Sequence, residues 1–285
     1  MDPGPAPTET CYRHPTRDTG RHCTRCDRPA CPECLRPASV GAHCVECVAA
    51  TRAPRAERRR VQSTLAGPSL WATKILIGLN LAVFVLAVVD GAPPNGTGAF
   101  HARWGLFGPI IDLDGEWWRL VTSGFLHSGF VHLGLNMAAL YFLGRIIEPA
   151  IGPIRFSLLY LASLLGGSMG ALVVDPVALT VGASGAIYGL MGAVVAGMRA
   201  RRVGLFESGI GGLLLVNLLF TFTVPGISIG GHVGGLVAGA AVGAVALAPG
   251  GERRPLPGSL AAVAVGGATL AGGMWAAGTW TAPLF

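Results

Sequence analysis

Residues 182–200 read GASGAIYGLMGAVVAGMRA, and residues 229–248 read IGGHVGGLVAGAAVGAVALA. Both stretches are apolar and rich in small residues, and near its start each has one polar side chain, Ser184 in the first and His232 in the second. Apolar runs of about 20 residues are typical of transmembrane helices. Polar side chains are costly inside a bilayer, so those that occur there are candidates for function. The two stretches predict a helical membrane protein with a functional site at membrane depth.

The composition of the whole chain points to the same class. Of its 285 residues, 51% are hydrophobic, only 13% are charged and 43 are glycine, which excludes an ordinary soluble domain. Apolar runs of about 18 to 22 residues predict about seven spans. These lie near residues 71–89, 130–148, 154–174, 183–200, 206–224, 229–248 and 259–278. We therefore expect an all-α polytopic membrane protein.

Basic residues are distributed unevenly among the segments between the spans. Eleven lysine and arginine residues precede the first span, and more follow the second, fourth and sixth, whereas Arg103 and Arg119 alone fall on the opposite side. By the positive-inside rule we expect a multi-pass protein of the plasma membrane with a cytoplasmic N-terminus and an outer C-terminus. The net charge of +6 is explained by this topology and by attraction to anionic lipid, so the lipid bilayer is an expected partner and nucleic acid is not.

All seven cysteines lie ahead of the first span, and with one histidine they form four pairs separated by two residues. The pairs are Cys11 with His14, Cys23 with Cys26, Cys31 with Cys34, and Cys44 with Cys47. Such pairs place two zinc ligands on one tight turn, and eight ligands predict two structural zinc ions. A disulfide framework is the alternative, but it needs an oxidising compartment and leaves one cysteine unpaired. His22 and His43 adjoin cysteines and could replace His14.

This pattern resembles B-box-like and related cross-brace zinc fingers. The resemblance implies that the first and third pairs bind one metal ion and the second and fourth pairs the other. A module of this size has too small a core to fold without metal. Because eight protein ligands leave no open coordination position, we expect a structural role, binding a cytoplasmic protein partner or positioning the rest of the chain, and no metal cofactor for catalysis.

Four polar side chains are predicted to lie in one layer of the membrane. With the N-terminus inside, the second, fourth and sixth spans all run from the outer to the inner surface, so their first residues share one depth. These residues are His132 and Asn136 on the second span, Ser184 on the fourth and His232 on the sixth. A serine hydroxyl needs a base to become a nucleophile, and histidine is the usual base. No acidic residue falls at this depth, so we expect a Ser184–His232 dyad, with Tyr188 one turn after the serine packed against the imidazole.

The remaining parts of an acyl-transfer site are also present. His132 and Asn136 lie four residues apart on one helix face and could donate hydrogen bonds to an oxyanion, together with the backbone N–H of Ser184. Stripes of glycine should let the fourth and sixth spans approach closely. The stripes consist of Gly185, Gly189 and Gly192 on the fourth span and Gly231, Gly235 and Gly239 on the sixth.

Taken in order, these motifs resemble the rhomboid intramembrane serine proteases. The resemblance covers roughly residues 71–249 and rests on Trp118-Arg119, His127, His132-x3-Asn136, Gly182-Ala183-Ser184-Gly185, Tyr188 and His232-x2-Gly235-x3-Gly239. It implies a six-helix core with a water-filled cavity open to the outside, and single-pass transmembrane proteins as substrates, cut in or near their spans. It also implies that Ser184 is the nucleophile, His232 the base, and His132 and Asn136 the oxyanion donors.

Further residues take supporting roles from the same resemblance. Gly182 and Gly185 flank the nucleophile, and Gly235 allows close helix contact. Trp118 and Arg119 match a loop that packs partly into the outer leaflet, and Glu148 matches a carboxylate that ends the second span. His101 and His127 fall outside the catalytic set; we expect a solvated side chain for His101 and a structural role for His127.

The expected organisation has five parts. They are a disordered tail over 1–10, a zinc-binding module over 11–47, a basic linker over 48–68, a protease-like core with six spans over 69–249, and a cytoplasmic loop with a seventh span over 250–285. Two other classes compete with a protease. One is a non-catalytic membrane receptor or scaffold whose zinc module binds a cytoplasmic partner. The other is a transporter, which should have repeated halves and broken helices.

Overall fold

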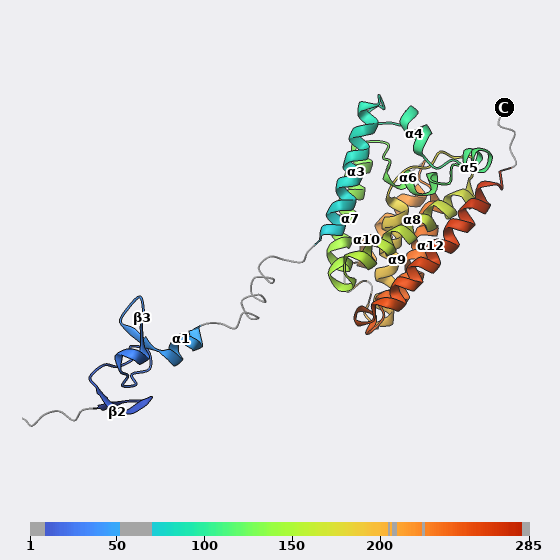
Figure 1. Cartoon of the computed structure of the whole chain (residues 1–285). Helices are drawn as coiled ribbons and strands as arrows, with labels where there is room; N and C mark the ends of the chain where they lie inside the picture. The colour runs from blue at the N-terminus through green and yellow to red at the C-terminus, as the bar shows by residue number, and fades with distance from the viewer. Residues whose placement is uncertain (1–8, 52–69, 205, 207–209, 224–225, 281–285) are drawn as a thin grey trace, which may run out of the picture. The chain divides into compact units, whose positions relative to one another are not determined.

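The computed structural model describes residues 9–51, 70–204, 206, 210–223 and 226–280 (Figure 1). The chain divides into two compact units, Met1–Pro68 and Ser69–Phe285. Most of the expected tail, residues 1–8, and most of the expected linker, residues 52–68, lie outside the described residues.

The N-terminal unit is built from two short hairpins and a helix. Strands β1 (Glu9–Cys11) and β2 (His14–Thr19) pair antiparallel, as do β3 (Leu35–Pro37) and β4 (Ala42–Cys44). A 3-10 turn η1 (Pro32–Cys34) precedes β3, and helix α1 (Val45–Thr51) follows β4. The buried hydrophobic cluster holds one alanine and three cysteines. A core this small needs another source of stability, such as bound metal.

The second unit is entirely helical where it is described. Its long helices are α3 (Trp71–Val89), α7 (Phe130–Ile151), α8 (Pro153–Val174), α9 (Ser184–Ala200), α10 (Ile210–Thr223), α11 (Ile229–Ala246) and α12 (Pro255–Ala277). Each lies where a span is predicted. Five of them, α3, α7, α8, α11 and α12, are long and apolar enough to cross a membrane, whereas α9 has 17 residues and α10 has 14. The fold class of an all-α polytopic membrane protein is confirmed.

Local sequence explains where one of these helices ends and the next begins. Helix α7 stops at Gly152, whose φ of +81° lies in the left-handed region that glycine tolerates. Pro153 then opens α8, because proline at the first helical position has no amide hydrogen to leave unsatisfied. The two helices are therefore joined by a single residue.

Helix α8 lies at the centre of the bundle. It packs against α9, α11 and α12, and α12 runs along it as the seventh span (Figure 1). The contact between α8 and α11 is made by backbone: a Cβ added at Gly166 or Gly170 would overlap atoms of α11. Helices α3 and α12 turn large apolar side chains such as Leu79, Val85 and Trp275 outward, as helices in contact with lipid do.

Short helices fill the long connection between α3 and α7. They are α4 (Ala99–Trp104), α5 (Gly108–Asp114), α6 (Arg119–Thr122) and the 3-10 turn η2 (Ser123–Phe125); a further 3-10 turn, η3 (Gly251–Arg253), precedes α12. Arg119 is buried and ties this connection together, because it pairs with Glu116 at 2.6 Å and donates to the carbonyls of Ala102 and Gly105 at 2.8 Å.

The expectation of a solvated His101 is wrong. Its side chain is 2% exposed, and its two ring nitrogens contact the backbone N–H of Gly98 at 3.2 Å and the carbonyl of His127 at 3.1 Å. The connection folds back on itself and buries this ring, which the polar local sequence does not reveal.

Candidate functional site

Ser184 and His232 are in hydrogen-bond contact. Ser184 is the first residue of α9, and His232 lies in the first turns of α11. The distance from His232 Nε2 to Ser184 Oγ is 2.9 Å. A hydroxyl and an imidazole 48 residues apart in sequence are thus brought together by two helix starts.

Two further side chains hold the imidazole. Tyr188 stacks on it, with ring centroids 4.0 Å apart and an angle of 14° between the planes. Thr221 Oγ1, from α10, lies 2.8 Å from His232 Nδ1. Tyr188 is predicted from the sequence and Thr221 is not, because a threonine within an apolar span has no spacing that distinguishes it from a packed residue.

The ring of His132 lies against Gly182, close to Ser184. A Cβ added at Gly182 would lie 2.9 Å from His132 Nε2 and 3.7 Å from Ser184 Oγ, so this ring lies against the residue two before the serine. The φ of +130° at Gly182 also favours glycine. His132 Nδ1 faces Ser128, 3.1 Å from its hydroxyl oxygen and 3.5 Å from its backbone nitrogen. A backbone N–H can only donate, so Nδ1 of His132 is the acceptor in this contact. The proton of the neutral His132 ring is therefore assigned to Nε2.

Asn136 lies one turn further along α7 and is buried. Its Nδ2 donates to the carbonyl of His132 at 2.8 Å, which uses one of its two N–H groups. The other N–H is left for another acceptor. Asn136 is therefore held in place by its own helix, on the face that carries His132.

Glycine allows α9 and α11 to approach closely. A Cβ at Gly235 would overlap the backbone of Gly185, and a Cβ at Gly239 would overlap that of Gly189. Gly231 differs from the expectation, because a Cβ there would point toward Ser228 and Ala171 of α8 instead of α9. The glycine contacts of α11 thus face two helices, α8 and α9, and the second contact sets the separation of Ser184 and His232.

Gly235→Ala is expected to push α9 and α11 apart. The added methyl would meet the backbone of Gly185, which cannot move aside without displacing the serine beside it. Misplacement by about 1 Å can cost about 10²-fold in rate, and overpacking costs about 1–3 kcal/mol of stability. The measurement is the rate of reaction with a fluorophosphonate together with the melting temperature. Gly267→Ala on α12 is the matched control, since nothing lies within 4 Å of its added Cβ; equal behaviour of the two variants would contradict the packing role.

The remaining residues named from the sequence lie around this site. Trp118 is 37% exposed and precedes the buried Arg119. Glu148 accepts hydrogen bonds from the backbone N–H groups of Ala72 and Thr73 at 3.0 and 2.9 Å, and from the Thr73 hydroxyl at 2.6 Å. This buried carboxylate therefore satisfies the first amides of α3 and fastens that helix to α7.

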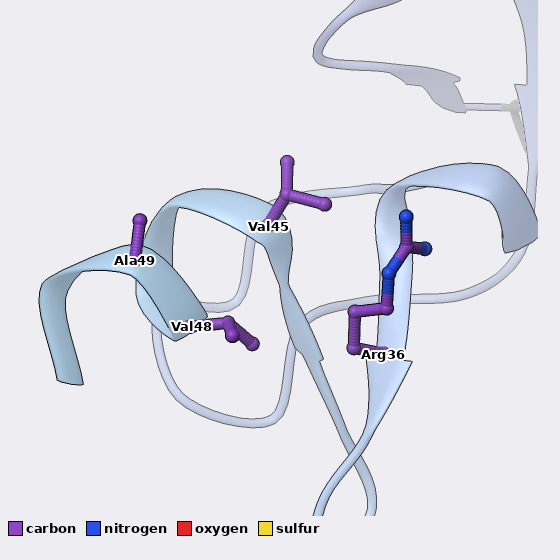
Figure 2. Close-up of a pocket in the computed structure, with 4 residues that line it drawn as sticks. All are labelled: Arg36, Val45, Val48 and Ala49. Atoms are coloured by element: carbon purple, nitrogen blue, oxygen red, sulfur yellow. The ribbon is translucent and has the colours of Figure 1, made fainter. Parts of the chain in front are cut away.

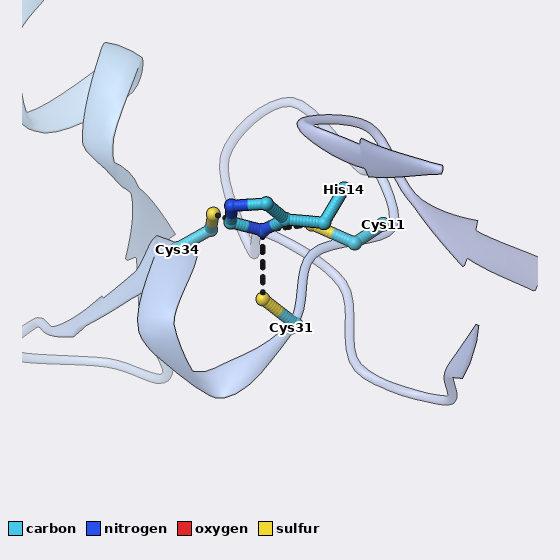
Figure 3. Close-up of side chains that lie close together, drawn as sticks. All are labelled: Cys11, His14, Cys31 and Cys34. Atoms are coloured by element: carbon cyan, nitrogen blue, oxygen red, sulfur yellow. Dashed lines mark hydrogen bonds between the residues drawn. The ribbon is translucent and has the colours of Figure 1, made fainter. Parts of the chain in front are cut away.

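The N-terminal unit assembles the eight predicted zinc ligands into two groups. Cys11, His14, Cys31 and Cys34 form the first group (Figure 3), and Cys23, Cys26, Cys44 and Cys47 form the second; within each group all ligand atoms lie within 4.8 Å of one another. His14 Nδ1 lies 3.4 and 3.5 Å from the sulfurs of Cys31 and Cys34. The grouping joins the first pair with the third and the second with the fourth.

The chemistry of both groups fits a tetrahedral zinc ion. A tetrahedron with Zn–S bonds of about 2.3 Å has edges of about 3.8 Å, and the sulfurs of Cys26 and Cys44 are 3.8 Å apart. Burial acts to raise the pKa of the Cys23 thiol. Hydrogen bonds from the backbone amides of Cys44, Arg25 and Cys26 together outweigh this effect and lower the pKa to about 6. This favours the thiolate that metal binding needs.

Two alternatives to this ligand set are a disulfide framework and His22 or His43 in place of His14; neither is found among the described residues. None of the seven cysteines, all of them among the described residues, is joined in a disulfide in the structure. His22 pairs with Glu9, and neither His22 nor His43 is in a ligand group.

A shallow pocket on the N-terminal unit lies outside both ligand groups. It is lined by Arg36 of β3 and by Val45, Val48 and Ala49 of α1 (Figure 2). The Arg36 guanidinium donates to the carbonyls of Glu33 and Leu35 at 2.8 and 2.9 Å. The pocket has no nucleophile or base among its lining residues.

The helical unit is thus defined by a serine and a histidine in contact within a membrane-spanning bundle. Residues 114–249 match the family described as Rhomboid domain. This part of the chain is similar to a rhomboid domain. The match covers η2, α6 and the helices α7 to α11, which carry every residue of the serine–histidine site.

Comparison with individual proteins gives the same family. The chain is 37% identical over 171 residues to rhomboid protease GluP of Bacillus subtilis (strain 168), which covers 59% of this chain and 33% of that protein. It is 34% identical over 141 residues to RHOMBOID-like protein 5 of Arabidopsis thaliana, covering 47% and 45% of the two chains. It is also 32% identical over 127 residues to inactive RHOMBOID-like protein 8 of the same plant, covering 43% and 36%. The chain spans less than half the length of each of these relatives.

Proposed function

We propose that this protein is an intramembrane serine endopeptidase. The observation that carries the proposal is the 2.9 Å contact between His232 Nε2 and Ser184 Oγ, in a domain whose relatives include a named rhomboid protease. Ser184 is the nucleophile and His232 is its general base. The same family also contains a relative named inactive, so activity has to be measured on this chain itself.

The reaction follows from the positions of the two side chains. His232 Nε2 takes the proton of the Ser184 hydroxyl as Oγ attacks the carbonyl carbon of the scissile peptide bond. The resulting imidazolium gives this proton to the leaving amine as the carbon–nitrogen bond breaks. A water molecule, activated by the same imidazole, then hydrolyses the acyl-enzyme and restores the serine.

The tetrahedral intermediate needs hydrogen-bond donors for its oxyanion. His132 Nε2–H is one donor, because its Nδ1 accepts from Ser128. Asn136 Nδ2 is the second, and the backbone N–H of Ser184 at the start of α9 is the third. Donors fixed before the reaction stabilise the developing charge without reorganisation.

Asn136→Ala is expected to lower turnover by about 10²-fold, because one oxyanion donor typically contributes this much. The variant should still cleave faster than Ser184→Ala, since nucleophile and base remain. The measurement is kcat for cleavage of a reporter substrate with one transmembrane helix. Asn80→Ala, on α3, removes a buried amide whose Nδ2 donates to the carbonyl of Leu76, outside the Ser184 site, and serves as the control for loss of a buried asparagine. An unchanged kcat in Asn136→Ala would remove Asn136 from the site.

The substrates we propose are single-pass transmembrane proteins, cut in or near their spans. Ser184 and His232 both lie in the first turns of their helices, so the scissile bond would meet them close to one membrane surface. The lipid bilayer is the second partner, and the two zinc ions of the N-terminal unit are structural. A cytoplasmic protein partner of this unit stays a prediction.

We propose a cytoplasmic N-terminus, an outer C-terminus and a location in the plasma membrane. The uneven distribution of lysine and arginine supports this orientation. Alkaline phosphatase fused after residue 285 should be active, and the same reporter on the N-terminus should be inactive. Two inactive fusions would mean an even number of spans and would contradict the orientation.

The function is tested with purified protein in lipid vesicles that also contain the transmembrane reporter substrate. We expect cleavage within or next to the reporter's span, and its loss after treatment with a fluorophosphonate. A folded protein that neither cleaves nor reacts would favour the non-catalytic receptor or scaffold.

A further inference from the structure

The His232 ring has a hydrogen-bond partner on the edge that faces away from Ser184. Nδ1 lies 2.8 Å from Thr221 Oγ1, and the Thr221 side chain is 2% exposed. Nε2, on the opposite edge, lies 2.9 Å from Ser184 Oγ. The imidazole is therefore held between hydroxyl groups from two different helices, α9 and α10.

The contacts of Thr221 support one placement of the imidazole proton. The Thr221 hydroxyl donates its single proton to the carbonyl of Asn217, one turn earlier in α10, at 2.9 Å. In this arrangement its oxygen accepts from His232 Nδ1–H, so we assign the imidazole proton to Nδ1. The lone pair of Nε2 is left facing Ser184, which is the tautomer that a general base requires.

Tyr188 joins the same network. Its hydroxyl lies 2.5 Å from Thr221 Oγ1 and 2.5 Å from the carbonyl of Asn217, while its ring stacks on the imidazole. Thr221 thus fixes the edge of the His232 ring, and Tyr188 fixes its face. Among the residues that the structure describes, no carboxylate is hydrogen-bonded to His232.

We propose that Thr221 is a positioning residue that selects the reactive tautomer and orientation of His232, in the place where other serine hydrolases use a carboxylate. The inference rests on the proposed function of the Ser184–His232 pair. When His232 takes the serine proton, the Nδ1–H bond to Thr221 becomes charge-assisted and strengthens. Thr221 therefore contributes more in the transition state than in the ground state, and its loss lowers kcat more than it changes KM.

The test compares kcat and KM of the full-length protein in lipid vesicles, with the transmembrane reporter as substrate. Thr221→Val keeps the shape but removes the acceptor, and should lower kcat about tenfold to a hundredfold with little change in KM. Thr221→Ser keeps the hydroxyl and should restore kcat to within about threefold. Thr223→Val is the matched control, because this threonine bonds only the carbonyl of Leu219 on the same helix and is exposed. Melting temperatures are measured for every variant, and Thr221→Ala replaces Thr221→Val if the latter does not fold.

The outcomes separate this inference from the function on which it rests. A wild-type protein that does not cleave would overturn both. Cleavage by the wild type with an undiminished kcat in Thr221→Val would overturn the positioning role alone. A Thr221→Ser variant as slow as Thr221→Val would also overturn the positioning role, because the hydroxyl would then not be needed. An equal loss of kcat in Thr223→Val would overturn it too, because the loss would then not be specific to Thr221.

Discussion

Ser184→Ala and His232→Ala are each expected to abolish cleavage of a transmembrane substrate. A nucleophile and its base act as one unit, so removing either should lower kcat by about 10⁴-fold or more. The two side chains meet at 2.9 Å, and both lie at helix starts where alanine fits without strain. Cleavage is measured in lipid vesicles, with melting temperature measured in parallel.

The double variant Ser184→Ala/His232→Ala should be no slower than either single variant, because the pair shares one step. Ser259→Ala is a suitable control, since this half-buried serine on α12 donates to the carbonyl of Pro255 in its own helix and lies outside the site. Cleavage at the wild-type rate by Ser184→Ala would end the protease interpretation.

Removing zinc is expected to unfold the N-terminal unit. Its buried hydrophobic residues are one alanine and five cysteines, and binding of structural zinc supplies about 10–16 kcal/mol in comparable modules. Elemental analysis of the reduced protein should find about two zinc ions per chain, as two sets of four ligands require. Cys34→Ser should lower this to about one and expose the unit to proteases.

His43→Ala is the control for this second prediction, because His43 lies beside Cys44 but outside both ligand groups. Its zinc content should stay at about two. The reaction of Ser184 with a fluorophosphonate should survive Cys34→Ser, because the helical unit is a separate compact unit. A zinc content near zero in the reduced wild-type protein would contradict the structural role.

Much of the architecture can be predicted from the sequence. Apolar length and periodicity locate the helices because a bilayer fixes how long a span must be. The x-two spacing identifies the eight candidate metal ligands as four pairs, because two residues on one turn can reach one ion. The residues Ser184, His232 and Tyr188 can be named in advance because each stands out from an apolar span.

The partners of these residues cannot be predicted in the same way. Thr221 meets His232, and Thr73 meets Glu148, across two helices whose rotation about their axes the sequence does not specify. His101 is misjudged for a related reason, since its burial depends on how a long connection folds back. Helix α9 begins one residue later than the predicted span, because the exact end of a helix is not marked by apolar composition. The predicted span 206–224 includes residues 207–209 and 224, which lie outside the described residues.

The central claim is that the oxygen of Ser184 is a nucleophile activated by His232. The most direct measurement is mass spectrometry of the full-length protein after reaction with a fluorophosphonate in lipid vesicles, with peptide mapping of the adduct. We expect one adduct, on Ser184, that is absent in His232→Ala and in heat-unfolded protein. A folded wild-type protein without an adduct, or one labelled at another residue while Ser184 stays unmodified, would contradict it.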